Sequence, residues 1–221
     1  MTSSDGPWIL SGMTDNNARH EAPVRAFLAT IVTQPEQHAR FLNMLSMLEH
    51  MGSRKIMVSQ MHDPANMTED MLKHLAEEAR HAYFFKRQAE RIARGPMPGY
   101  HDDNTFCRIP AAMYFGRLDA GLSKRVPAAE AYPWVSLIIE LRACWLYALY
   151  HEVLQEAKVT ISLKSLLAEE DMHLAEMFEM CGDNIPRLKD MSAYETELFG
   201  KLFATLQAEL STGHGMSAKA A

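Results

Sequence analysis

The chain has 221 residues, of which 48% are hydrophobic and 23% charged, which is typical of a globular protein with a sizeable core. Its formal net charge of −6 provides no basic surface, so nucleic acid is not expected as a partner. The three cysteines, Cys107, Cys144 and Cys181, are far apart, which excludes a disulfide framework and a cysteine-based zinc or rubredoxin-type site.

We find no targeting or membrane-spanning segment in the sequence. The first fifteen residues have neither a basic start nor an apolar run, so no signal peptide is predicted. The most apolar stretch, residues 134–150, contains Glu140 and Arg142 and is too short to span a bilayer easily. We therefore expect a cytoplasmic protein in which this stretch forms a central buried helix.

Apolar residues at helical spacing predict an all-α fold. We expect a flexible N-terminus over 1–16, a single helical domain over 17–210 and a flexible tail over 211–221. A short helix is expected at 23–33. The long helices are predicted at 36–60, 68–94, 129–157, 162–181 and 185–210.

The predicted connections differ in how clearly the sequence marks them. His-Asp-Pro-Ala-Asn at 62–66 is a turn signal, whereas 155–161 contains neither Gly nor Pro and marks its turn weakly. Residues 95–129 are rich in Gly and Pro and long enough for a crossover, with a short helix at 111–122.

Two Glu-x-x-His tetrads carry the chemistry. They are Glu78 with His81 and Glu170 with His173, and each follows a Glu in an apolar helical stretch, Glu49 (78 − 49 = 29) or Glu140 (170 − 140 = 30). Residues three apart on a helix point in similar directions, so a Glu and a His can bind one ion. Because chance alone gives about one such tetrad in a chain of this composition, the evidence lies in the pair and its preceding Glu residues.

The spacing also predicts which ligands meet. The midpoint of Glu49 and Glu78 falls in the 62–66 turn, and residues equidistant from the turn of an antiparallel hairpin lie at the same height. The midpoint of Glu140 and Glu170 falls at Gln155, in the weakly marked turn. Four carboxylates buried together repel one another, and two divalent cations would neutralise them.

With these residues the chain resembles the ferritin-like diiron-carboxylate superfamily, over roughly residues 36–181. Glu-Glu-Ala-Arg-His at 77–81 is similar to the motif of bacterial multicomponent monooxygenase hydroxylases and acyl carrier protein desaturases. The resemblance implies a four-helix bundle with a long crossover between its second and third helices and extra flanking helices. It also implies one iron on Glu49, Glu78 and His81 and the other on Glu140, Glu170 and His173.

The resemblance further implies that Glu77 and Glu169 accept hydrogen bonds from the ligand histidines; as the alternative, both are solvated helix charges. Met172 stands where the second motif would carry Arg. Phe85 stands where the ribonucleotide reductase small subunit has its radical tyrosine, and Leu166 where arylamine N-oxygenases have an extra histidine.

The function expected from the resemblance is a dioxygen-activating oxygenase or oxidase with two iron ions, as Fe/Fe or Mn/Fe. This function requires a small apolar organic substrate, and an external electron donor is expected because the chain has no flavin or iron–sulfur motif. A homodimer is compatible with the sequence, which leaves the oligomeric state open. A ferroxidase or iron-storage protein without organic substrate is the alternative, and a partner subunit that has lost its chemistry is a third reading.

Several other residues leave two readings open. Cys144, one turn after Glu140, either lines the site or is a plain core cysteine. An apolar group is more readily explained by core packing than by a substrate pocket, and its members are Phe84, Phe85, Trp145, Leu146 and Leu174. His50 is expected at the surface or beside a ligand. No role at the site is predicted for His62, His74 or His151.

Overall fold

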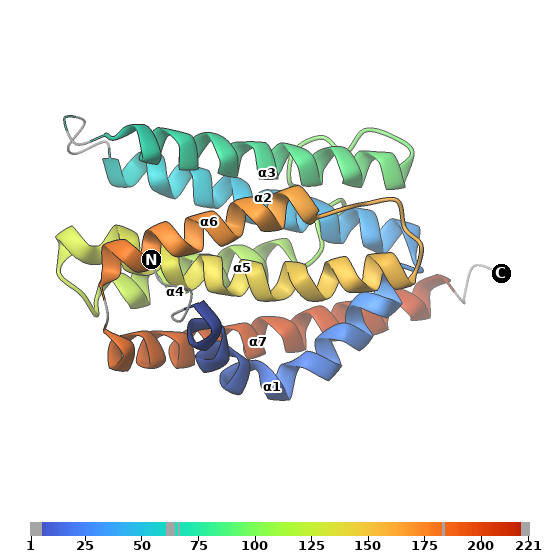
Figure 1. Ribbon diagram of the computed structural model, residues 1–221. Coiled ribbons are helices and arrows are strands. Elements are labelled where there is room, and N and C mark those ends of the chain that lie inside the picture. The colour runs from blue at the N-terminus through green and yellow to red at the C-terminus, as the bar shows by residue number, and fades with distance from the viewer. Residues whose placement is uncertain (1–5, 61–64, 66, 183, 218–221) are drawn as a thin grey trace. The chain divides into compact units, whose positions relative to one another are not determined.

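The computed structural model describes residues 6–60, 65, 67–182 and 184–217, and over these residues the ordered elements are all helical. The helices, drawn in Figure 1, are α1 Gly6–Ile31, α2 Pro35–Gln60, α3 Glu69–Ala93, α4 Arg108–Ser123, the short 3-10 helix η2 Ala128–Glu130, α5 Ala131–Glu156, α6 Lys164–Cys181 and α7 Ile185–Ser217. The all-α prediction is therefore confirmed, as are the four helices that carry the predicted ligands, to within about two residues at each end. The predicted turn at 62–66 falls, except for Ala65, outside the described residues.

The two ends of the chain are more helical than predicted. Helix α1 begins at Gly6 and contains Pro23 in its interior, so the prediction of a short helix starting at residue 23 is wrong. The buried side chains Val24, Phe27 and Leu28 explain the difference, because their packing outweighs the roughly 3 kcal/mol that an internal proline costs. Helix α7 continues to Ser217, beyond the predicted end at residue 210.

The chain divides into two compact units, each assembled from separate stretches of sequence. Unit 1 contains residues 1–28 and 117–203, and unit 2 contains residues 29–116 and 204–221. Unit 1 thus holds the hairpin of α5 and α6, and unit 2 holds the hairpin of α2 and α3.

In unit 2, α2 and α3 lie side by side (Figure 1). Thr68 begins α3, since its side chain accepts a hydrogen bond from the backbone of Met71. The segment after α3 is held to the hairpin by Asn43 of α2, whose amide donates to the Thr105 hydroxyl at 2.9 Å. Lys86 of α3 donates to the Asn43 amide oxygen at 2.7 Å, so α2, α3 and the segment that follows them are cross-linked through one side chain.

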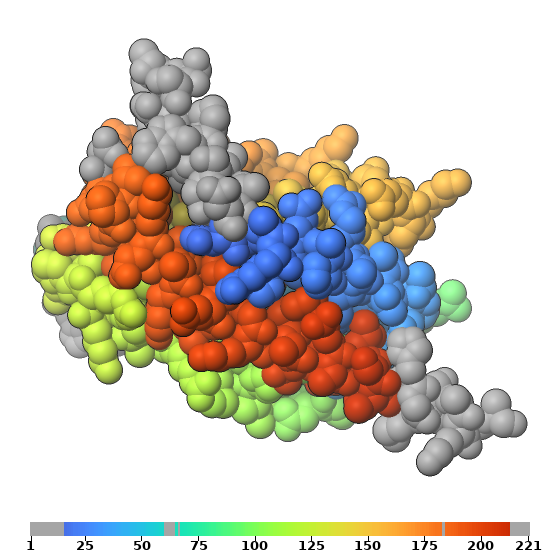
Figure 2. All heavy atoms as spheres, turned by 90° about the horizontal axis from the view of Figure 1, so that it is seen from below, coloured from blue at the N-terminus to red at the C-terminus, as the bar shows by residue number. Residues whose placement is uncertain are grey.

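In unit 1, α1 packs along α7 on the face drawn in Figure 2. The rings of Phe27 and Phe203 meet edge to face with centroids 5.7 Å apart. Helix α7 also provides Glu195, which is fully buried and accepts a 2.7 Å hydrogen bond from Arg142 of α5. This buried ion pair fixes α5 against α7, because removing either partner would leave a charge without compensation.

The turn between α5 and α6 forms without Gly or Pro, because Lys158 takes the left-handed backbone conformation that glycine usually provides. Lys158 has a φ of +55°, and the backbone of Val159 donates to the carbonyl of Leu154 while Lys158 donates to that of Gln155. This is the Schellman arrangement, which usually places glycine at the left-handed position. Ile161 and its neighbour Leu163 are buried and anchor the segment that follows.

None of the helices among the described residues is both long enough and apolar enough to cross a membrane.

Replacing Lys158 by glycine should stabilise the protein by about 1 kcal/mol, because a left-handed backbone strains a residue that has a Cβ. Urea unfolding followed by circular dichroism measures the change. As a control, exposed Ala148 of α5 should lose about 1 kcal/mol when changed to glycine, because it occupies the helix interior. A Lys158→Gly variant that is no more stable than wild type would contradict the proposed strain.

His38 should make folding stability depend on pH. Burial lowers the pKa of His38 to about 4 from its ordinary value near 6.5, so between these values the unfolded chain binds a proton that the folded chain excludes. Stability is therefore full above about pH 6.5 and falls as the pH decreases towards 4. Urea unfolding of metal-free protein at about pH 7.5 and pH 5 should show about 2 kcal/mol more loss in wild type than in His38→Gln. The exposed control His101→Gln should behave as wild type, and equal losses in all three proteins would refute the role of His38.

Candidate metal centre

Three of the predicted ligands come together in unit 2. Glu49 projects from α2, and Glu78 and His81 project from α3; all three are buried. One ligand atom from each lies within 4.8 Å of the others, and His81 Nδ1 is 3.8 Å from Glu78 Oε1. We call these residues the α2–α3 ligand set. The predicted meeting of Glu49 with Glu78 is therefore confirmed.

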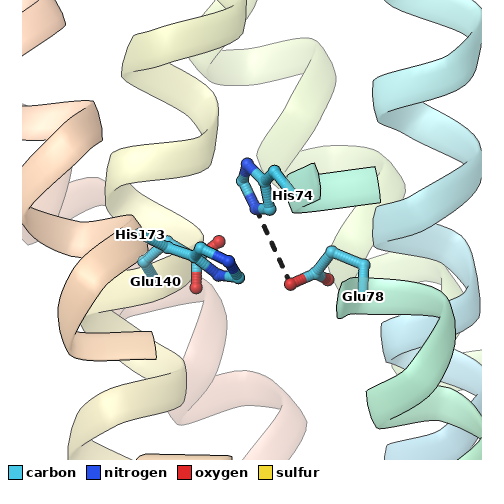
Figure 3. A group of neighbouring side chains, drawn as sticks. All are labelled: His74, Glu78, Glu140 and His173. Carbon is cyan, nitrogen blue, oxygen red and sulfur yellow. Dashed lines mark ion pairs between the residues drawn. The ribbon is translucent and has the colours of Figure 1, made fainter. Parts of the chain in front are cut away.

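The other three predicted ligands come together in unit 1. Glu140 projects from α5, and Glu170 and His173 project from α6; these too are buried. Ligand atoms of Glu140 and His173 lie within 4.8 Å of each other, and Figure 3 shows the two side chains together. His173 Nδ1 is 3.6 Å from Glu170 Oε2. We call these residues the α5–α6 ligand set.

Helical periodicity explains why the carboxylates are buried. On α2, Glu49 follows the fully buried Leu42 and Leu45 at spacings of three and four residues, which places all of them on one face. On α5, Glu140 stands between buried Ile138 and Leu141 in a helix that is apolar on most of its surface. The apolar packing of these helices thus brings each carboxylate into the interior.

His74 is a site residue that the sequence prediction missed. It is buried on α3, four residues before Glu78, and its Nε2 lies 3.7 Å from Glu78 Oε1, as the dashed line in Figure 3 marks. The signal was present in the sequence, because residues at i and i+4 share a helix face. Of the other two histidines left without a site role, His151 accepts a 3.4 Å hydrogen bond from the backbone of Leu163, and His62 lies outside the described residues.

Gly52 of α2 also belongs to the surroundings of the ligands. A Cβ at this position would lie 2.8 Å from Glu78 Oε2, closer than real Cβ contacts. Gly52 is one helical turn after Glu49, so the missing side chain leaves the space that the Glu78 carboxylate occupies. No sequence motif reveals this, since the contact joins two helices.

The charges near the α5–α6 ligand set are predominantly negative. Burial raises the pKa of the Cys144 thiol, and the negative charges of Glu170 and Asp171 raise it further. Burial also raises the pKa of Asp171, and the negative charge of the Glu170 carboxylate raises it further. Cys144 is therefore buried within electrostatic reach of Glu170, which is compatible with both of its readings.

Arg142 does not offset these negative charges. Of the Arg and Lys side chains that the structure describes, Arg142 is the one that is buried. Its guanidinium donates a hydrogen bond to Glu195. Neutralising the ligand carboxylates therefore requires protons or metal cations.

The structure also bears on the residues next to the motifs. Glu77 forms an ion pair with Arg80 on the same helix, with 3.9 Å between Nη2 and Oε1. Met172, at the position corresponding to Arg80, is exposed, so the departure from the motif falls on the surface of α6. His50 is exposed, as one of its two readings predicts.

Of the apolar residues near the motifs, Phe85 and Leu174 are buried in the core, and Phe84, Trp145 and Leu146 are half-buried. Phe84 and Phe85 contact each other edge to face, and Trp145 contacts Phe199 of α7 with ring centroids 5.8 Å apart. A groove of about 700 Å³ in unit 2 is lined by Arg40 and Arg91 among others, and no predicted ligand lines it.

The donor atoms suit first-row divalent metals. Imidazole nitrogen and carboxylate oxygen bind Fe²⁺ and Mn²⁺, and a carboxylate can bridge two ions. Each ligand set offers two carboxylates and an imidazole on helices, which hold side chains more rigidly than loops do. Buried groups of His and Glu side chains in this structure could therefore hold a metal ion.

Replacing Gly52 by alanine should weaken metal binding without harming the fold. The added Cβ displaces the flexible end of Glu78, so metal affinity should fall about 10- to 100-fold. Helix stability should rise by about 0.5–1 kcal/mol, because alanine favours a helix more than glycine does.

Calorimetric titration with Co²⁺ and urea unfolding of the metal-free protein measure the two effects. Gly116→Ala is the matched control, since nothing lies within 4 Å of a Cβ at that position in α4. It should gain the same stability with unchanged affinity, whereas unchanged affinity in Gly52→Ala would show that Glu78 does not bind the metal from this position.

Comparison of the chain with family models, curated proteins and solved structures finds no match. The likeness to ferritin-like diiron-carboxylate proteins accordingly depends on the two ligand motifs and their spacing.

Proposed function

We propose that the chain is a dinuclear iron enzyme that activates dioxygen and oxidises a small apolar organic substrate. In this proposal α2, α3, α5 and α6 form a ferritin-like four-helix bundle, and the two ligand sets together enclose a pair of ions. The ion pair is Fe/Fe or Mn/Fe.

One observation carries the proposal. Both hairpins repeat the same order, a buried Glu on one helix followed by a buried Glu-x-x-His pair on the next. All six predicted ligands are buried, although charged and polar side chains of these types are usually exposed. Amphipathic surface helices would turn such residues to water, so the repeated burial supports a shared function over coincidence.

Charge supports two ions in place of one. The six residues include four carboxylates, and two divalent cations balance four negative charges. Protonation could neutralise the carboxylates instead, but it would leave the buried imidazoles without a role. The pairing of His81 with Glu78 and of His173 with Glu170, each within 4 Å, is the arrangement that one ion on each motif needs.

When bound, the ions would supply the redox chemistry, in which dioxygen accepts electrons and the substrate is oxidised. For a monooxygenation, one oxygen atom enters the substrate and the other leaves as water with two protons. The two further electrons come from an external donor, such as a reduced flavoprotein or iron–sulfur protein. The chain's own residues hold the ions and exclude water, with Cys144 and buried Leu174 contributing apolar surface.

The proposal predicts that single ligand substitutions reduce metal loading. Wild-type protein reconstituted anaerobically with Fe²⁺ should contain two ions per chain by elemental analysis, and His81→Ala and Glu170→Ala should each contain one or fewer. The physical reason is that each substitution removes a strong donor from a buried site. The exposed residues Arg87 and Glu179, on α3 and α6, provide the alanine controls and should leave loading unchanged.

Dioxygen uptake then tests the reaction class. With reductant present, an oxygenase or oxidase consumes dioxygen beyond the amount of iron added. Uptake that stops at the iron stoichiometry, in a large shell-like assembly by gel filtration, would instead identify a ferroxidase. Full loading in both ligand variants would sink the metal-centre assignment.

A further inference from the structure

The α3 helix carries one more potential ligand than the six on which the proposed function rests. His74, Glu78 and His81 follow one another at spacings of four and three residues, and all three are buried. His74 Nε2 lies 3.7 Å from Glu78 Oε1, and His81 Nδ1 lies 3.8 Å from the same oxygen. A single carboxylate on α3 therefore has an imidazole on each side.

The helix geometry separates the two imidazoles. Seven residues advance an α-helix by about 10.5 Å and return it to nearly the same direction. Two nitrogens on one ion, each about 2.1 Å from it, lie no more than about 4 Å apart. His74 and His81 thus approach Glu78 from opposite ends and are poorly placed to bind the same ion.

The grouping of the ligand atoms agrees with this separation. Atoms of Glu49, Glu78 and His81 lie within 4.8 Å of one another. His74 shares such a group with Glu78 but is not in the group of Glu49 and His81. Within unit 2, Glu78 thus pairs with His74 and, separately, belongs to the trio of Glu49, Glu78 and His81, and a carboxylate shared in this way can bridge two ions.

We propose that His74 is a seventh metal ligand, which binds the ion on the far side of Glu78 from His81. This inference rests on the proposed dinuclear centre. It adds that the two metal positions have different numbers of histidine ligands. On α6 the residue four before Glu170 is Leu166, which is buried and offers no donor. The additional imidazole therefore has no counterpart, and three imidazoles are divided unequally between two ions.

The metal position that His74 binds has more nitrogen ligands than the other position and should therefore prefer different metals. Mn²⁺ suits carboxylate, carbonyl and water ligands, and imidazole suits Fe, Co and later metals, which also bind more strongly in general. The position served by His74 should therefore favour Fe²⁺ or Co²⁺ over Mn²⁺ more strongly than the other position does.

The test uses the full chain and Co²⁺ as the probe. Anaerobic calorimetric titration should resolve two ions per wild-type chain. In His74→Leu one of the two should lose at least tenfold in affinity while the other keeps its affinity. X-ray absorption of the cobalt-loaded proteins should show three imidazole ligands for every two cobalt ions in wild type, and two in His74→Leu.

The variants separate a ligand role from a structural one. Leucine keeps the helical propensity of α3 and reproduces the residue found at position 166. His74→Gln serves as the second, polar variant and should show the same loss. His50→Gln, at an exposed position on α2, should match wild type, and circular dichroism of the metal-free proteins checks that all of them fold.

The outcomes distinguish this inference from the proposed function. Unchanged affinities and imidazole count in both folded His74 variants would overturn the inference and leave the two-ion centre intact. Loss of both ions from the folded variants would refute the assignment of His74 to one of them. Fewer than two ions in the wild-type chain would overturn both proposals.

Discussion

The concentration of negative charge in a dry interior is the constraint on which the rest of the site depends. Glu49 and Glu78 present carboxylate oxygens within 4.8 Å of each other, and two like charges at that distance repel by roughly 3 kcal/mol at an effective dielectric constant of 20. Desolvation adds to this cost. A fold that buries both carboxyl groups must therefore either protonate them or provide a counter-charge, and the histidines beside them are side chains that transition metals bind well.

The helices meet this constraint by separating structural from chemical roles. The buried charge pair of Arg142 and Glu195 holds α5 to α7 and is satisfied within itself. The candidate ligands instead come from the faces of α2, α3, α5 and α6, each positioned by apolar neighbours on the same stripe. Because a helix fixes the relative direction of residues three and four apart, the donor geometry follows from the backbone and needs no loop to order.

Sequence reasoning succeeded where a periodic pattern repeats and failed where a single tertiary contact decides. The Glu-x-x-His pairs and the meeting of Glu49 with Glu78 follow from helix spacing and hairpin symmetry. The length of α1 was missed because packing outweighs Pro23, and the turn after α5 was weakly marked because Lys158 takes a position usually held by glycine. His74 could have been found from its spacing to Glu78, but Gly52 could not, since its role appears only when α2 and α3 are packed together.

At Gly52, the stability of α2 and the space needed by the Glu78 carboxylate favour different residues. A glycine inside a helix lowers its stability relative to alanine, and such a position is usually an easy target for strengthening a protein. Here the same methyl group would intrude on a carboxylate. If Glu78 binds a metal as proposed, alanine at position 52 would strengthen α2 and at the same time impair the proposed centre, so the helix and the carboxylate make opposite demands on one residue.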